Sequence, residues 1–153
     1  MIAIIDYDAG NTFNVQKALQ HIGLDAVLTA DRETILAADG VILPGVGAYA
    51  SAVSVLCERG LIEVIHEVVD RNIPLLGICL GMQLLFDESE EYGPTPGLGI
   101  IPGTVKAIPN NLGLRVPHMG WNQNTLCRKN SAFFDVADKY TYFVHSYYVE
   151  TDS

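Results

Sequence analysis

The chain has 153 residues, of which 49% are hydrophobic and 18% charged, and its nine basic and eighteen acidic residues give a formal net charge of -9 at pH 7. A chain of this length can bury one hydrophobic core, so we expect residues 1–153 to form a single domain. The negative charge disfavours nucleic acid as the main ligand, because it repels phosphate backbones.

The chain begins with a short apolar run, Ile2 to Asp6, which predicts a buried strand. The run has no basic leader and is too short for a signal peptide or a membrane span, so we expect a cytoplasmic protein with no membrane partner. A helix is expected to begin near Asn11 or Thr12, which are capping residue types, and to end at Gly23. The second predicted strand is Asp25 to Thr29.

The alternation of strand and helix continues to residue 89. The predicted elements are a short helix capped by Asp31, a strand in residues 40–45, one broken helix or two in residues 51–72, a strand in residues 73–78 and a helix in residues 80–89. Because the strands are apolar throughout, this order predicts an α/β fold with an open, mostly parallel sheet of the flavodoxin-like kind and helices on both faces. Ligands of such sheets bind at the carboxyl ends of the strands.

The second half of the chain has a different pattern. Residues 91–103 are rich in glycine and proline and predict a loop. Three shorter strand-like segments follow, in residues 103–108, 116–122 and 140–150. We expect these segments to be antiparallel additions to one end of the sheet.

The stretch GICLG, Gly77 to Gly81, places Cys79 between a buried strand and a helix, as in a nucleophile elbow. The glycines remove the Cβ atoms that would block a sharp turn, and a helix N-terminus favours a thiolate. The backbone N–H of Leu80 would then face a developing oxyanion. A buried, inert cysteine is the alternative, because free cysteine is often buried.

The stretch PGVGAY, residues 44–49, follows the third predicted strand and ends at the same edge of the sheet. Backbone N–H groups of Val46 or Gly47 could supply a second oxyanion donor there. The same residues also fit the dinucleotide pattern G-x-G-x-x-A, which is the basis of an alternative function. That match is weak, because the pattern belongs after the first strand and the acidic residues Glu67 and Asp70 lie in a helical segment.

The remaining reactive side chains have structural interpretations. The three cysteines form no C-x-x-C pair, which suits a reducing compartment; Cys57 is expected in the core and Cys127 in an exposed loop. The expected roles are helix surface for His21 and His66, and a strand or subunit contact for His118 and His145. Asp6 and Asp8 are expected to shape the loop or to cap the helix, and Trp121 is expected in the core or at an interface. We predict no metal site.

Six stretches in this order, IIDYDAGN, LPGVGAY, LLGICLGMQLLF, GLGIIPG, PHMGWN and FVHSYYV, cover nearly the whole chain. With them the chain resembles the class I glutamine amidotransferases. Among these enzymes it is most similar to the glutaminase subunits of imidazole glycerol phosphate synthase, because DYDAGN and PHMGWN occur together.

The resemblance implies hydrolysis of L-glutamine to glutamate and ammonia, without a cofactor, as part of histidine biosynthesis. The ammonia would pass to a cyclase subunit, the partner in a heterodimer, which forms imidazole glycerol phosphate and aminoimidazole carboxamide ribotide. By position, Cys79 matches the nucleophile that forms a thioester, and Leu80, Val46 and Gly47 match the oxyanion-hole backbone. The residues that match the glutamine-binding region are Gln83, Ser146 and Tyr147.

One part of the family pattern is missing. Members of the class complete the site with a His-x-Glu pair, usually in His-Pro-Glu, and none of the four histidines here is followed by glutamate at that spacing. A thiol nucleophile needs a base, so we expect a glutaminase domain that lacks its C-terminal part and is inactive by itself. A non-catalytic docking module of the same fold is the alternative, and neither His118 nor His145 matches the missing base.

Overall fold

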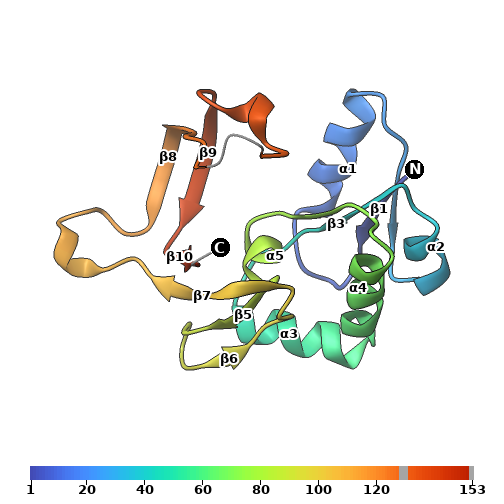
Figure 1. The fold of residues 1–153 in the computed structure, drawn as a ribbon, viewed down its shortest axis with the longest axis horizontal. Helices are drawn as coiled ribbons and strands as arrows, with labels where there is room; N and C mark the ends of the chain where they lie inside the picture. Colours follow the sequence, from blue (N-terminus) through green and yellow to red (C-terminus); the bar gives the residue numbers. More distant parts are fainter. Residues whose placement is uncertain (128–130, 152–153) are drawn as a thin grey trace. The chain divides into compact units, whose positions relative to one another are not determined.

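The structure is a computed structural model that describes residues 1–127 and 131–151. It divides into two compact units (Figure 1). The first unit comprises Met1–Lys106 and the residues from Val149 onward, and the second comprises Ala107–Tyr148.

The first unit contains the predicted parallel sheet. Its strands are β1 (Ile2–Ile5), β2 (Ala26–Thr29), β3 (Gly40–Leu43) and β4 (Leu75–Gly77), in the order β2-β1-β3-β4. All three pairings are parallel. The α/β fold class is therefore confirmed, and the four strands end at one common edge.

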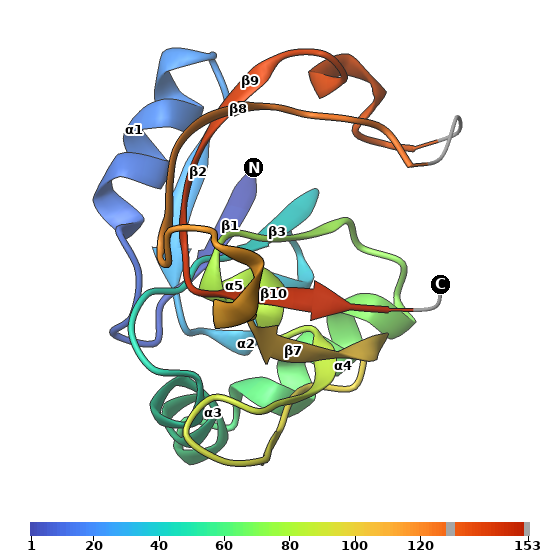
Figure 2. The same cartoon turned by 90° about the vertical axis from the view of Figure 1, so that its left-hand side faces the viewer.

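Four helices connect these strands: α1 (Thr12–His21), α2 (Arg32–Leu36), α3 (Tyr49–Glu58) and α4 (Leu61–Asp70). Asn11 and Asp31 cap α1 and α2, as predicted. The pattern in residues 51–72 forms two helices, because Gly60 at φ +64° interrupts it. Right-handed crossovers place α1 on one face of the sheet, and α2 and α4 on the other (Figure 2).

The helix expected in residues 80–89 is much shorter. Only Leu80–Gln83 form α5, and Phe86–Ser89 form the strand β5. This strand pairs in parallel with β7 (Ile101–Ala107) and antiparallel with β6 (Thr95–Pro96). This pairing explains why the helix prediction for residues 86–89 is wrong. Phe86 and Ser89 are buried in the strand, and the backbone groups of β5 form hydrogen bonds with strands that are distant in sequence. Ile101 and Pro102, expected in a loop, are part of β7 for the same reason.

The later strands form sheets of their own and do not extend the parallel sheet. One has the order β10-β7-β5-β6, with β10 at Tyr147–Glu150. The other, in the second unit, pairs β8 (His118–Gln123) with β9 (Tyr140–His145) in antiparallel register. The 3-10 turns η1 (Asn110–Leu112) and η2 (Phe134–Val136) also belong to the second unit.

The core of the first unit lies between the sheet and its helices. Fully buried side chains come from β1, β3, α2, α3 and α4, and they include Ile4, Ile5, Ile35, Leu43, Leu56 and Ile65. Cys57, expected in the core, is exposed because the buried face of α3 is formed by Tyr49, Ala52 and Leu56. Among the described residues, no helix is long and apolar enough to cross a membrane.

Candidate active site

Cys79 lies in a sharp turn between β4 and α5. It is the N-cap residue of α5, with φ 55° and ψ -117°, a backbone conformation that non-glycine residues rarely adopt. The residue is exposed. The geometry expected of a nucleophile elbow is therefore present, and the alternative expectation that Cys79 is buried is wrong.

The two glycines of the elbow are required by close backbone packing. A Cβ atom on Gly81 would lie 1.9 Å from the carbonyl oxygen of Leu43, and one on Gly77 would lie 2.5 Å from Cα of Met82. Side chains cannot approach backbone atoms so closely. The elbow is thus held directly against the end of β3, and the N–H of Ile78 donates a hydrogen bond of 3.0 Å to Leu43 O.

The loop after β3, residues 44–48, packs on the elbow at its beginning. Pro44 and Gly45 are buried, and a Cβ on Gly45 would lie 2.6 Å from the backbone N of Gly81. Val46 is 56% exposed, and a Cβ on Gly47, at φ +93°, would meet no atom within 4 Å. The middle of the loop is therefore open to a ligand while its first residues are fixed.

The far end of this loop is held by an acidic side chain. The backbone N of Tyr49, at the start of α3, donates to Glu91 Oε2 at 2.7 Å. Ala48, the N-cap residue, makes no side-chain cap of its own, so Glu91 supplies the acceptor from 42 residues away. Sequence reasoning missed Glu91, because no local pattern links it to this helix.

The N–H of Leu80 has no backbone acceptor among the described residues, as an oxyanion donor requires. Because α5 has only four residues, it contributes free N–H groups at this point and little of a helix macrodipole. The expectation that a long helix follows Cys79 is corrected accordingly. Gln83 lies one turn further along α5 and is half-buried, and its N–H donates to Cys79 O at 3.2 Å.

The loop after β1 borders the same region. Asp6 Oδ1 accepts from the N–H of Asp8 at 3.4 Å, and the side chain of Asp8 forms an ion pair with Arg59. A Cβ on Gly10 would lie 3.0 Å from Cβ of Pro44. These contacts agree with the expected loop-shaping role, whereas the alternative of helix capping is wrong because Asn11 caps α1. The described residues contain no cluster of three or more potential metal ligands.

Two tyrosines near the 44–48 loop are fully buried. Tyr7 Oη donates to Pro44 O at 2.7 Å, whereas Tyr49 Oη has no hydrogen-bond partner among the described residues. Burial, and secondarily the charge of Cys79, raises the pKa of Tyr7 to about 12. Burial, and secondarily the charges of Asp87 and Glu88, raises the pKa of Tyr49 to about 12.

These shifts predict unfolding at alkaline pH. A phenol whose pKa is raised on folding stabilises the protein fully below its unfolded value near 10, and this stabilisation is lost as the pH rises toward 12. Between pH 8 and pH 11 each tyrosine should contribute roughly 1.4 kcal/mol to the decline, because pH 11 lies about one unit above the unfolded pKa and one below the folded pKa. Urea unfolding at pH 8 and pH 11 measures it, and the Tyr7→Phe and Tyr49→Phe variants should each decline less steeply. Equal slopes in all three proteins would contradict this assignment.

Ser146 and Tyr147 lie in the second unit. Ser146 is the residue between β9 and β10, and Tyr147 is the first residue of β10. Within that unit, Ser146 O accepts from the N–H of Ile108 at 2.9 Å. The grouping of these two residues with Cys79 stays a prediction, whereas Val46, Gly47, Leu80 and Gln83 share the first unit with Cys79.

The four histidines occupy the expected structural positions. His21 and His66 are exposed on α1 and α4. In the second unit, His118 Nδ1 and His145 Nε2 are 2.8 Å apart across the β8–β9 pair, and His145 Nδ1 donates to Tyr147 O at 2.8 Å. These two histidines therefore bond to each other, in agreement with a structural role in the strands.

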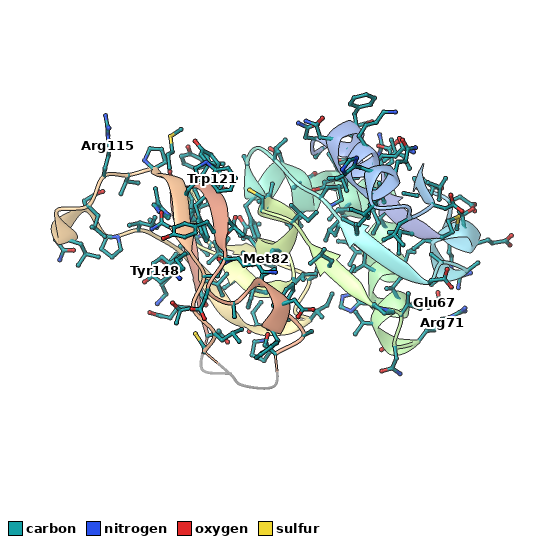
Figure 3. The ribbon with its side chains drawn as sticks, turned by 90° about the horizontal axis from the view of Figure 1, so that it is seen from above. Glu67, Arg71, Met82, Arg115, Trp121 and Tyr148 are labelled. Carbon is teal, nitrogen blue, oxygen red and sulfur yellow. The ribbon has the colours of Figure 1, made fainter. Side chains whose placement is uncertain are left out.

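One of the two acidic residues considered for dinucleotide binding, Glu67, forms ion pairs elsewhere. Glu67 forms ion pairs with Arg32 and Arg71 on the outer surface of α4, and Figure 3 labels Glu67 and Arg71 side by side. Burial is the largest single effect and raises the pKa of Glu67, but the hydrogen bonds and positive charges of Arg32 and Arg71 together hold this pKa below its usual value. This carboxylate therefore does not lie at a strand end, where it could accept a hydrogen bond from a ribose hydroxyl.

Comparison with known proteins gives a consistent result. The family model described as glutamine amidotransferase class-I matches residues 3–153. The imidazole glycerol phosphate synthase subunit HisH of Lacticaseibacillus casei is 56% identical over 151 residues, which are 99% of this chain and 73% of that protein. The HisH subunit of Lactiplantibacillus plantarum is 53% identical over 97% of this chain and 71% of its own length.

A third relative, the HisH subunit of Streptococcus sanguinis, is 51% identical over 98% of this chain and 72% of its own length. A solved structure titled "Crystal structure of glutamine amidotransferase" superposes with a TM-score of 0.64 at 21% identity, over 80% of this chain and 63% of that one. At that identity the superposition supports the fold alone.

Proposed function

The chain belongs to the class I glutamine amidotransferases and, within them, to the HisH subunits of imidazole glycerol phosphate synthase, and we propose that it provides the cysteine half of a glutaminase site for histidine biosynthesis. The observation that carries the proposal is the elbow at Cys79. Its positive φ, its exposure and its packing against the end of β3 are the features that a presented nucleophile requires.

The proposed reaction begins with attack of the Cys79 thiolate on the side-chain amide carbon of glutamine. A C–S bond forms, and the negative charge that develops on the amide oxygen is stabilised by the N–H of Leu80 and by the Val46–Gly47 backbone. The C–N bond then breaks, and the nitrogen leaves as ammonia after taking up a proton. Water hydrolyses the resulting glutamyl thioester, which releases glutamate and regenerates the thiol.

The side chains proposed to hold glutamine, by their match to the family's glutamine-binding region, are Gln83, Ser146 and Tyr147. Amide and hydroxyl groups suit the α-amino and α-carboxylate groups of the substrate, which need hydrogen-bond partners. In this proposal the two units belong to one glutaminase domain in the cytoplasm, and no cofactor takes part. The chemistry then rests on Cys79 and on a base that the sequence, which has no His-x-Glu pair, does not supply.

The partner proposed for this chain is the cyclase subunit, to which ammonia would be passed. In the second unit, Met119, Trp121 and Tyr142 are each more than half exposed, and the Trp121 and Tyr142 rings contact each other across the β8–β9 pair. Figure 3 labels Trp121. Exposed aromatic and methionine side chains are typical of protein interfaces. Their exposure supports the proposal that this face meets another subunit.

Covalent labelling tests the proposed function. A glutamine analogue with an electrophilic side-chain group should modify Cys79 at least about a hundredfold faster than Cys57, which is also exposed but lies on α3 outside the elbow. Mass spectrometry of the two cysteine peptides in one sample gives both rates. An excess of glutamine should slow modification at Cys79 only.

The Cys79→Ala variant should show no specific modification. Equal labelling of Cys57 and Cys79, or glutamine-sensitive labelling that persists in Cys79→Ala, would overturn the assignment. An analogue that labels neither site above the rate of a simple alkylating agent would favour the docking-module alternative.

A further inference from the structure

Tyr7 lies two residues after the end of β1 and is fully buried, although its side chain ends in a polar hydroxyl. The hydroxyl donates to the carbonyl oxygen of Pro44 at 2.7 Å, across 37 residues of sequence. Pro44 is the first residue of the 44–48 loop, which carries the proposed oxyanion donors. The phenol therefore links the end of β1 to the beginning of that loop.

The same phenol approaches the cysteine elbow. A Cβ atom on Gly45 would lie 2.8 Å from Tyr7 Oη, 2.6 Å from the backbone N of Gly81 and 2.9 Å from Cβ of Leu80. The phenol oxygen, the loop backbone and the residues after Cys79 thus surround one glycine. No side chain could be placed at Gly45 without separating them.

From this arrangement we propose that Tyr7 is a positioning residue for acylation of Cys79. Its hydroxyl fixes the orientation of the Pro44–Gly45 peptide. The orientation of this peptide sets the direction in which the 44–48 loop leaves β3 toward the elbow. The inference rests on the proposed function and extends it to a residue outside the elbow and the loop. Donors to an oxyanion act only within a few tenths of an ångström of their best distance. A hydrogen bond at the root of the loop therefore affects the reaction at its middle.

The hydroxyl is suited to this role at neutral pH. Burial, with the charge of Cys79 as the second cause, raises the pKa of Tyr7 to about 12, so the phenol remains a neutral hydrogen-bond donor. The neutral hydroxyl donates its hydrogen bond to Pro44 O and adds no negative charge beside Cys79.

Two electrophiles separate positioning from a general structural effect. An activated aryl ester at the side-chain carboxyl group of glutamate acylates Cys79: the C–S bond forms, the C–O bond to the aryl group breaks, and an aryl oxide leaves without needing a strong acid. This reaction passes through an oxyanion. Iodoacetamide alkylates the same thiol by displacement of iodide at carbon, and no oxyanion forms. Both rates are measured on the Cys79 peptide of the full chain.

Tyr7→Phe should lower the acylation rate about tenfold and leave the iodoacetamide rate within about twofold. Tyr49→Phe is the matched control: Tyr49 is equally buried and lies at the other end of the loop, but its hydroxyl bonds to no described residue. That variant should acylate at the wild-type rate. If Tyr7→Phe folds poorly, 4-aminophenylalanine at position 7, which keeps an N–H donor, should retain most of the acylation rate.

A Tyr7→Phe variant that acylates at the wild-type rate would overturn the proposal, and so would a parallel fall in both rates. Failure to recover acylation with 4-aminophenylalanine in a folded protein would also overturn it. Failure of the proposed function is distinguishable, because the wild-type chain itself would then show no preferential acylation of Cys79 over Cys57.

Discussion

Replacing Gly81 with alanine is expected to destabilise the first unit by at least about 4 kcal/mol, or to prevent its folding. The added Cβ would lie 1.9 Å from Leu43 O, 2.7 Å from the carbonyl carbon of the same residue and 3.0 Å from that of Pro44. These are backbone atoms of β3 and of the loop after it, which cannot rotate away as a side chain can. The elbow would have to separate from the sheet.

The measurement is the free energy of unfolding from urea titration followed by circular dichroism. Gly60→Ala is the matched control, because Gly60 lies at φ +64° between α3 and α4 and a Cβ there meets nothing within 4 Å. It should cost only about 1 kcal/mol, the strain of a left-handed alanine. If the two variants lost similar amounts of unfolding free energy, backbone conformation and not close packing would be the reason that glycine is required at position 81.

Supplying the missing base is expected to raise glutaminase turnover by at least about a thousandfold. The 153 residues contain no His-x-Glu pair, so the Cys79 thiol has no partner of that kind to accept its proton and return it to ammonia. The HisH subunit of Lacticaseibacillus casei is longer than the matched region, which spans 73% of it. A chimera that continues this chain with the remaining segment of that relative tests the requirement.

Release of glutamate from glutamine, measured with and without the cyclase subunit, compares the chimera with the 153-residue chain. The family resemblance implies that the added segment carries a His-x-Glu pair, and a second chimera with the histidine of that pair changed to alanine should return to the low rate. The assignment of the base would be wrong if the 153-residue chain alone turned over glutamine at the rate of the chimera.

Several features of the fold could be predicted because they depend on local sequence. Apolar runs separated by amphipathic segments predict the parallel sheet, and Asn11 and Asp31 cap the helices that they precede. The elbow was predictable for the same reason, since the glycine spacing around Cys79 and the conformation that it allows belong to five consecutive residues.

Features that depend on a distant partner could not be predicted in this way. Residues 86–89 follow a short helix and have a helical pattern, yet they form β5 because β7 and β6 offer backbone partners. Cys57 is on a helix with apolar residues on several sides, and only the packing of α3 decides which side is buried. Helical periodicity alone does not distinguish these sides.

The sequence by itself determined the alternation of elements, the place of Cys79 in a turn between strand and helix and the need for glycine on both sides of it. The tertiary structure decided how that thiol is supported: Tyr7 reaches Pro44 from 37 residues away, and Glu91 reaches the N–H of Tyr49 from 42. The physical reason is that a turn is specified by the steric limits of neighbouring residues, whereas a buried hydrogen bond forms only after the chain brings donor and acceptor together.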